Sequence, residues 1–119
     1  MANGSIPKPY EGYKEYTLTI DSAATNFTLI RSHACKSGNI AFIQIVASIS
    51  ASQDDSSVAI ITLPDELQPK YNLEGRVATF GSGFDVNYNV YTNRSFRVQR
   101  TPSSIGGNFR IIVSYPTAT

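Results

Sequence analysis

The chain has 119 residues, which is the size of one domain with its own hydrophobic core. Charged residues make up only 16% of it and the formal net charge is +1, so the composition argues against nucleic acid as a main partner. A single cysteine excludes an intrachain disulfide framework, and one Cys with one His supplies too few ligands for the usual zinc sites.

Residues 1–12 are rich in glycine and proline and predict an extended arm or linker, so the folded domain is expected over residues 13–119. This arm lacks the apolar core of a secretory signal. The longest apolar run, Ile40–Ile49, is interrupted by Gln44 and Ser48 and is too short to cross a bilayer. We therefore expect no membrane insertion.

The first part of the domain alternates apolar and polar residues with the period of a β-strand. Tyr13–Ile20 predicts a half-buried strand, and Phe27–Ala34 predicts a second one after a polar turn. Lys36–Asn39 reads as a hairpin turn, because Gly and Asn tolerate positive φ angles.

Ile40–Ser50 predicts a long strand that is apolar on both faces. One face carries Ala41, Ile43, Ile45, Ala47 and Ile49, and the other carries Ile40, Phe42 and Val46. A strand that is apolar on both sides is expected to be covered on both sides. In a domain of this size, we expect the second cover to be another subunit.

The middle of the chain predicts an exposed loop and then a return to the sheet. Ser52–Ser57 is the polar loop, and Val58–Leu63 has the β-branched character of a buried strand. Pro64 ends that strand because proline has no backbone N–H to give to a ladder, and Pro69 fixes a second bend.

The final third shows the clearest alternation. The expected inward residues are Val86, Tyr88, Val90, Phe96 and Val98, and the expected outward residues are Asp85, Asn87, Asn89, Tyr91, Arg97 and Gln99. A turn at Thr92–Arg94 separates these two segments, and a loop at Thr101–Asn108 precedes the last strand, Phe109–Tyr115. About eight short strands predict an all-β, single-domain antiparallel barrel or sandwich of jelly-roll or Greek-key type.

Candidate catalytic groups are few. His33 and Cys35 would share one face of a continuous strand, but a buried cysteine beside a lone histidine is usually structural. Asp54 and Asp55 could form one side of a calcium or glycosidase site, yet adjacent acids in a serine-rich loop are commonly just solvated. Gly81–Gly83 predicts only a bend. We expect no enzyme, no metal site and no cofactor.

The outward face of the hairpin Gly83–Arg100 is the better candidate site. It combines a carboxylate, planar amides, a phenol and a guanidinium from Asp85, Asn87, Asn89, Tyr91, Arg97 and Gln99. These groups suit a saccharide, since they offer partners for hydroxyls and a flat ring for C–H faces. Arg97, with Arg94 or Arg110, could add contact to a phosphate or an acidic sugar. The alternative is an ordinary polar sheet face or a polar part of a subunit interface.

The order of short motifs over about Asn39–Thr119 resembles a known family. GNIAFIQIVASIS is followed by LPDELQP, GFDVNYNVY, SFRVQR, a Gly-Gly loop and a terminal YPT. This order is similar to that of the head domains of receptor-binding proteins, which sit at the tail tip or baseplate of siphophages that infect Gram-positive bacteria.

The resemblance implies a compact β-barrel head over residues 13–119 that assembles as a homotrimer and binds a cell-surface saccharide or phosphosaccharide. The positions that match the family's binding residues in kind are Phe84, Asp85, Asn87, Asn89 and Arg97. The family often places Trp at the saccharide, and this chain has none, so Tyr88 or Tyr91 would have to serve.

The sequence thus predicts a receptor-binding module of a phage or prophage tail, located in the virion tail. Its expected partners are a host cell-wall saccharide or phosphosaccharide and other tail or baseplate proteins. Two alternatives remain open: a structural tail or baseplate protein without a ligand, and a carbohydrate-binding module of a bacterial secreted enzyme.

Overall fold

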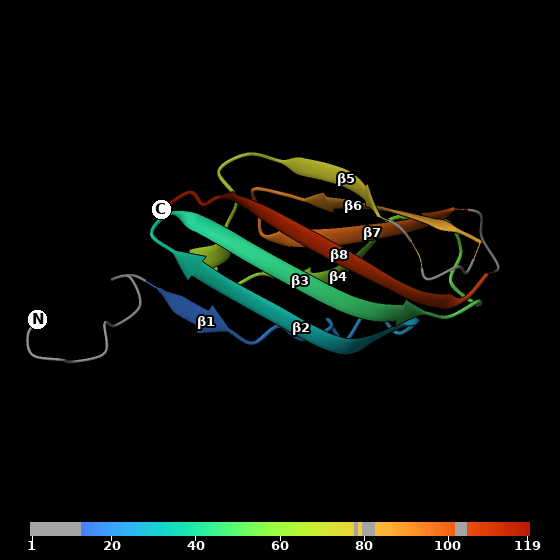
Figure 1. Ribbon diagram of the computed structural model, residues 1–119. Coiled ribbons are helices and arrows are strands. Elements are labelled where there is room, and N and C mark those ends of the chain that lie inside the picture. Colours follow the sequence, from blue (N-terminus) through green and yellow to red (C-terminus); the bar gives the residue numbers. More distant parts are fainter. Residues whose placement is uncertain (1–12, 78, 80–82, 102–104) are drawn as a thin grey trace, which may run out of the picture.

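A computed structural model describes residues 13–77, 79, 83–101 and 105–119, which form two packed antiparallel sheets (Figure 1). The strands are β1 (Lys14–Tyr16), β2 (Phe27–Ser37), β3 (Ile40–Ile49), β4 (Val58–Thr62), β5 (Leu73–Val77), β6 (Asp85–Val90), β7 (Ser95–Thr101) and β8 (Gly107–Pro116). The predicted arm of residues 1–12, and parts of the predicted bend at Gly81–Gly83 and loop at Thr101–Asn108, lie outside the described residues.

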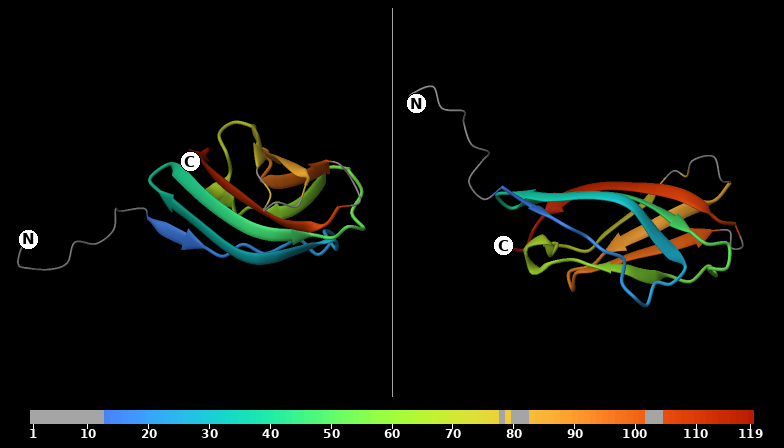
Figure 2. Two further views of the ribbon diagram at one scale, coloured as in Figure 1. Left: turned by 45° about the vertical axis from the view of Figure 1, so that its right-hand side comes forward. Right: turned by 90° about the horizontal axis from the view of Figure 1, so that it is seen from below.

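Each sheet has four strands. Sheet I has the order β1-β2-β3-β8, and sheet II has the order β4-β7-β6-β5. Sheet II is a Greek key, because β5, β6 and β7 are successive neighbours and β4 returns beside β7. The views in Figure 2 show the two sheets as separate layers. The predicted all-β antiparallel fold is confirmed, and it is a sandwich.

The core lies between the two sheets and is built by strict alternation. On β3, Ala41, Ile43 and Ile45 are fully buried and face sheet II. Sheet II contributes four inward side chains that are almost completely buried: Val86, Val90, Phe96 and Val98. Because successive side chains in a strand point to opposite faces, burial of these residues forces their neighbours in β6 and β7 outward.

The outer face of sheet I is also partly apolar. Ile40 and Ile112 lie on it with 49% and 52% of their surfaces exposed, whereas Val46, between Arg31 and Arg110, is buried. The prediction of a strand with two apolar faces is therefore confirmed. Within the described residues, the inner face is covered by sheet II and much of the outer face meets solvent.

Three elements differ from the sequence prediction. The segment predicted as a strand, Tyr13–Ile20, keeps its alternating burial, but its hydrogen-bonded pairing with β2 ends at Tyr16. Beyond Tyr16 the chain crosses to sheet II, where Asp21 N–H donates to Ile60 O. The second strand runs on to Ser37, so the hairpin turn shortens to two residues with Gly38 at φ +60°. Strand β5 was not predicted from the sequence.

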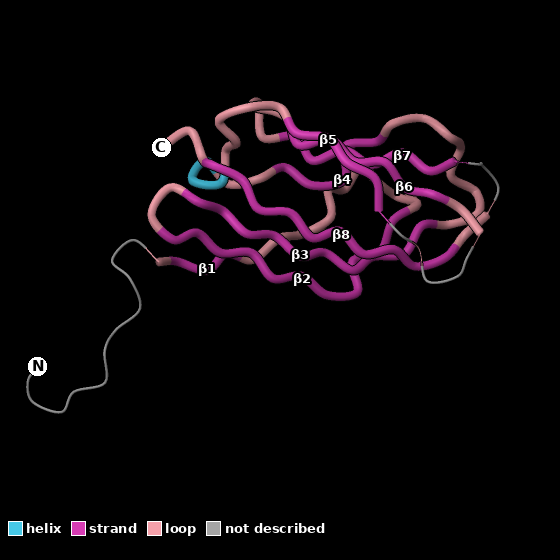
Figure 3. Tube along the Cα trace, turned by 45° about the horizontal axis from the view of Figure 1, so that its top comes forward, coloured by secondary structure: helices cyan, strands magenta, loops and turns pink. Residues whose placement is uncertain are grey.

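The proline segment after β4 is fixed from two sides. It contains the 3-10 turn η2 (Asp65–Leu67), which lies close to the C-terminus in Figure 3. Tyr115 Oη donates to Leu67 O at 2.6 Å, and Ala118 N–H donates to Gln68 O. On the other side Gln68 Nε2 donates to Thr92 O. These bonds hold the chain where it enters β5.

A buried arginine lies at one end of the core. Alternation along β7 turns Arg100 inward with Phe96 and Val98, and its side chain is fully buried. Its Nη1 donates to Ser50 O and Ile105 O, while Nε and Nη2 have no hydrogen-bond partner among the described residues. Two loops at this end are thus tied to one side chain.

We expect Tyr115→Phe to lower the free energy of unfolding at pH 7 by about 1 kcal/mol, the usual net value of a buried hydrogen bond. Burial also raises the pKa of the Tyr115 hydroxyl above its ordinary value of 10.0. The unfolded chain therefore ionises first, and this part of the stability, fully present below pH 10, is lost as the pH rises further.

Urea denaturation at pH 7 and above pH 10 measures both effects. The variant should lose less stability than the wild type between the two pH values. Tyr71→Phe, at an exposed ring, is the matched control and should behave as the wild type. Equal alkaline losses in Tyr115→Phe and the wild type would contradict the assignment.

Candidate functional site

The predicted polar set lies on the outward face of sheet II. The register places Asn87 of β6 between Arg76 of β5 and Gln99 of β7. It places Asn89 between Glu74 of β5 and Arg97 of β7. Two cross-strand rows of polar side chains therefore cover the centre of this face. The predicted sharing of one face by the β6 and β7 residues is confirmed.

The remaining two predicted residues flank these rows. Asp85 begins β6 opposite Thr101, and Tyr91 directly follows the end of β6. Tyr91 N–H donates to Ser95 O, which starts the turn into β7. Thr92 N–H donates to Asn72 Oδ1, so this turn is held beside the start of β5.

Two shallow hollows lie along β5 and β6, with volumes of about 450 Å³ and 370 Å³. The first is lined by Glu74, Gly75, Arg76, Asn87, Tyr88, Asn89 and Gln99, and the second by Asn72, Leu73, Glu74, Asn89 and Tyr91. They share Glu74 and Asn89, which are direct cross-strand partners. We call the two hollows together the β5–β6 groove.

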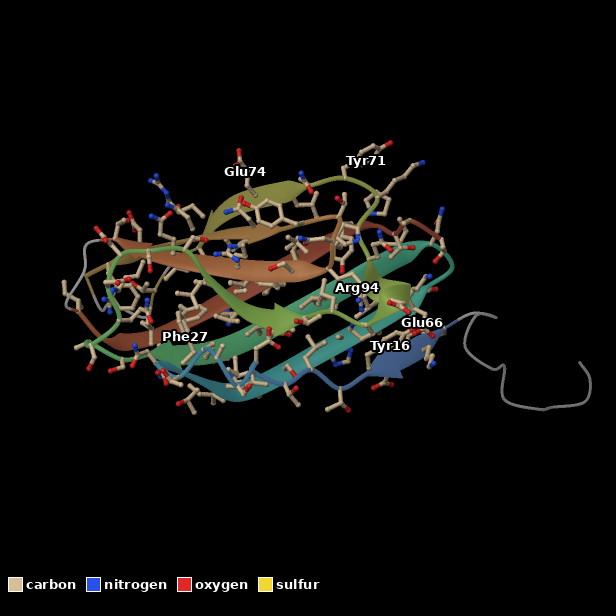
Figure 4. All side chains as sticks on the ribbon, turned by 180° about the vertical axis from the view of Figure 1, so that it is seen from behind. Tyr16, Phe27, Glu66, Tyr71, Glu74 and Arg94 are labelled. Atoms are coloured by element: carbon tan, nitrogen blue, oxygen red, sulfur yellow. The ribbon has the colours of Figure 1, made fainter. Side chains whose placement is uncertain are left out.

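The groove has unengaged polar groups at its centre. Among the described residues, the side chains of Glu74 and Asn89 have no hydrogen-bond or ion-pair partner, and neither has the Tyr91 hydroxyl. Figure 4 shows Glu74 projecting away from β5. A carboxylate, a primary amide and a phenol are thus free to bind a ligand that offers hydroxyl groups.

Arg76 is held by residues at one end of the groove. Its Nε donates to Asn87 Oδ1 at 3.3 Å, and its Nη1 lies 4.0 Å from Asp85 Oδ2. The Arg76 and Asp85 side chains are 71% and 60% exposed, so solvent screens the pair strongly. This arrangement aligns three side chains but adds little stability.

Arg97 and Gln99 bind a loop of the same chain. Arg97 Nε donates to Ser57 Oγ at 3.1 Å and Nη2 donates to Ser57 O at 2.8 Å. Gln99 Nε2 donates to Asp55 O at 2.9 Å. Hydrogen bonds from Ser56 to Asp54 order the same loop and lower the pKa of the Asp54 carboxyl. A phosphate contact by Arg97 would require it to release Ser57.

Arg94 and Arg110 do not reach the groove. Arg94 pairs with Asp65 at 2.9 Å and donates to Leu63 O, in a backbone conformation with φ 74°. Arg110 lies on the outer face of sheet I beside Val46. The structure therefore separates these two cations from Arg97, with which the sequence analysis combined them.

Of the three aromatic candidates, two pack against other residues of the protein and one is available to a ligand. Phe84 is buried, and the Tyr88 ring lies against Phe96 with a centroid distance of 6.1 Å. A Cβ atom on Gly75 would come within 2.5 Å of Tyr88 Oη, so glycine makes room for this ring. Burial also raises the pKa of Tyr88. Tyr91, at the far end of the second hollow, is the better-placed aromatic group.

Three polar groove residues were missed in the sequence analysis: Asn72, Glu74 and Arg76. All belong to β5 or to the residue before it, and β5 was not predicted. A signal was available, since Leu73, Gly75 and Val77 alternate with Glu74 and Arg76. The glycine weakened this pattern, because it contributes no apolar side chain at the centre of the strand.

The other candidate groups lie elsewhere. His33 and Cys35 share the outer face of sheet I, as predicted, and the His33 ring makes an edge contact with Phe42 at 6.0 Å. In the part of the chain that is described, no three His, Cys, Asp or Glu side chains are grouped to hold a metal ion. Nor do these residues include a helix with the length and apolar character needed to cross a bilayer.

We compared the chain with known protein families and with curated proteins. No protein-family model matches the chain, and no curated protein matches it.

We expect Arg97→Met to lower the free energy of unfolding by about 1–2 kcal/mol, because two hydrogen bonds to Ser57 are lost. Amide hydrogen exchange in the Ser52–Ser57 loop should accelerate. Arg76→Met is the matched control on the same face and should change stability by less than about 0.5 kcal/mol. Unchanged exchange in the loop of Arg97→Met would contradict the anchoring role.

Proposed function

We propose that this protein binds a saccharide through the β5–β6 groove and serves as a receptor-binding module of a phage or prophage tail. The single observation that carries the proposal is the pair Glu74 and Asn89. These side chains face each other across β5 and β6, line both hollows and have no partner among the described residues. Polar groups without a partner in an open groove match the needs of a ligand rich in hydroxyl groups.

The assignment to a phage tail rests on the resemblance in motif order, and the β-sandwich is compatible with it. In this proposal the chain acts as a homotrimer in the virion tail and contacts other tail or baseplate proteins. Shallow sites bind single sugars weakly, but three copies that face one cell surface raise the overall affinity through effective concentration. No covalent step is needed.

The outer face of sheet I supports the trimer. Ile40 and Ile112 are exposed side chains on it, and the half-buried Phe42 lies between Cys35 and Ser114. Such surface is commonly buried between subunits. The same observation favours a second candidate function, a structural tail or baseplate protein whose apolar face only contacts other virion proteins.

The binding test uses immobilised cell-wall polysaccharides from Gram-positive hosts and an array of bacterial oligosaccharides. We expect the wild type to bind at least one of them and Asn89→Ala to bind about fivefold to tenfold more weakly, the value of one or two hydrogen bonds. Asn39→Ala, at an exposed asparagine in the turn between β2 and β3, is the matched control and should bind as the wild type. Absence of binding, or equal loss in both variants, contradicts the proposal.

The trimer test is light scattering after size exclusion at micromolar concentration. We expect a trimer mass for the wild type and a monomer mass for Ile112→Lys, because a charge cannot be buried unpaired in the interface. Tyr71→Lys replaces another exposed large hydrophobic residue, outside sheet I, and should remain a trimer. A monomeric wild type would show that the outer face of sheet I does not assemble copies of this chain.

A further inference from the structure

We propose that the β5–β6 groove takes at least two consecutive sugar rings of a linear glycan and that it prefers neutral or amino sugars to acidic ones. This inference rests on the proposed function, since it specifies the ligand of the same groove. It departs from the expectation of a phosphosaccharide that the sequence analysis left open.

The length of the groove supports more than one ring. The two hollows share Glu74 and Asn89 in their linings, and each has a volume within the range of about 300–1,000 Å³ that is usual for small-ligand sites. Asn87 lines the first hollow and Tyr91 lines the second, and they are four residues apart along an extended segment, which is roughly 13 Å. A single pyranose ring is shorter than that.

The two ends of the groove differ in chemistry. The first hollow ends at Arg76 and Asn87, which are already hydrogen-bonded to each other. The second ends at Tyr91, whose ring can lie against the C–H face of a sugar. A chain of rings that runs along β6 would contact the shared pair Glu74 and Asn89 with its central hydroxyls.

The charge at the centre of the groove is negative. Glu74 has no ion-pair partner in the described part of the chain, and Arg76, a cation that lines the first hollow, lies toward Asp85 at the end of that hollow. The guanidinium of Arg97 is directed to Ser57, away from the groove. The carboxylate of an acidic sugar bound here would therefore be repelled by the Glu74 carboxylate, whereas the ammonium group of an amino sugar would form an ion pair with it.

The charge preference is tested by titration of the protein with glucose, glucosamine and glucuronate, which share one type of ring and differ in charge. Amide NMR shifts of residues 72–77 and 87–91 report binding. At low ionic strength we expect glucosamine to bind about threefold or more tightly than glucuronate, the value of one exposed ion pair. Glu74→Gln should bring the two affinities within about twofold. Glu66→Gln, which changes a carboxylate paired with Lys14, should keep the wild-type order.

The length is tested with N-acetylglucosamine and its β-1,4-linked disaccharide and trisaccharide. We expect affinity to rise by about tenfold from one ring to two, as an extra set of hydrogen bonds and a stacked ring add. Equal affinity for the three would overturn the two-ring site, and tighter binding of glucuronate than of glucosamine would overturn the charge preference. In both cases binding itself stands. If none of the sugars shifts these amides, the proposed function fails as well.

Discussion

Burial of one face of sheet II against β3 is the constraint on which the groove depends. Val86, Val90, Phe96 and Val98 belong to one core cluster with the inner residues of β3 and leave almost no surface exposed. Burying a side chain of this size is worth roughly 1.5–3 kcal/mol. A slip of one residue in β6 would bring Asn87 and Asn89 into the core and expose its valines. The core therefore determines which polar groups face outward.

Part of this arrangement could be predicted from the sequence. The alternation in β6 and β7 is regular, so the shared face of Asp85, Asn87, Asn89, Arg97 and Gln99 follows from strand geometry alone. The apolar side chains on both faces of β3 could also be predicted from the sequence. Strand β5 escaped prediction because Gly75 interrupts its apolar face, and with it Glu74 and Arg76 were missed.

Other features depend on contacts between segments that are distant in sequence, which a local pattern does not report. Arg97 and Gln99 stand outward as predicted, but the loop that they bind comes from before β4. The end of the ladder at Tyr16 depends on where Ile60 lies in the other sheet. Alternation gives the direction of a side chain, and only the tertiary structure gives its partner.

The outward polar residues of sheet II thus have two different roles. Arg97 and Gln99 hold the Ser52–Ser57 loop against β7, and Glu74 and Asn89 remain available at the centre of the β5–β6 groove. The most direct measurement is a crystal structure of the protein grown with a bacterial cell-wall oligosaccharide that it binds. The account predicts a sugar ring ordered between Glu74 and Asn89. An oligosaccharide ordered on sheet I or on the loops, with the groove holding only solvent, would contradict it.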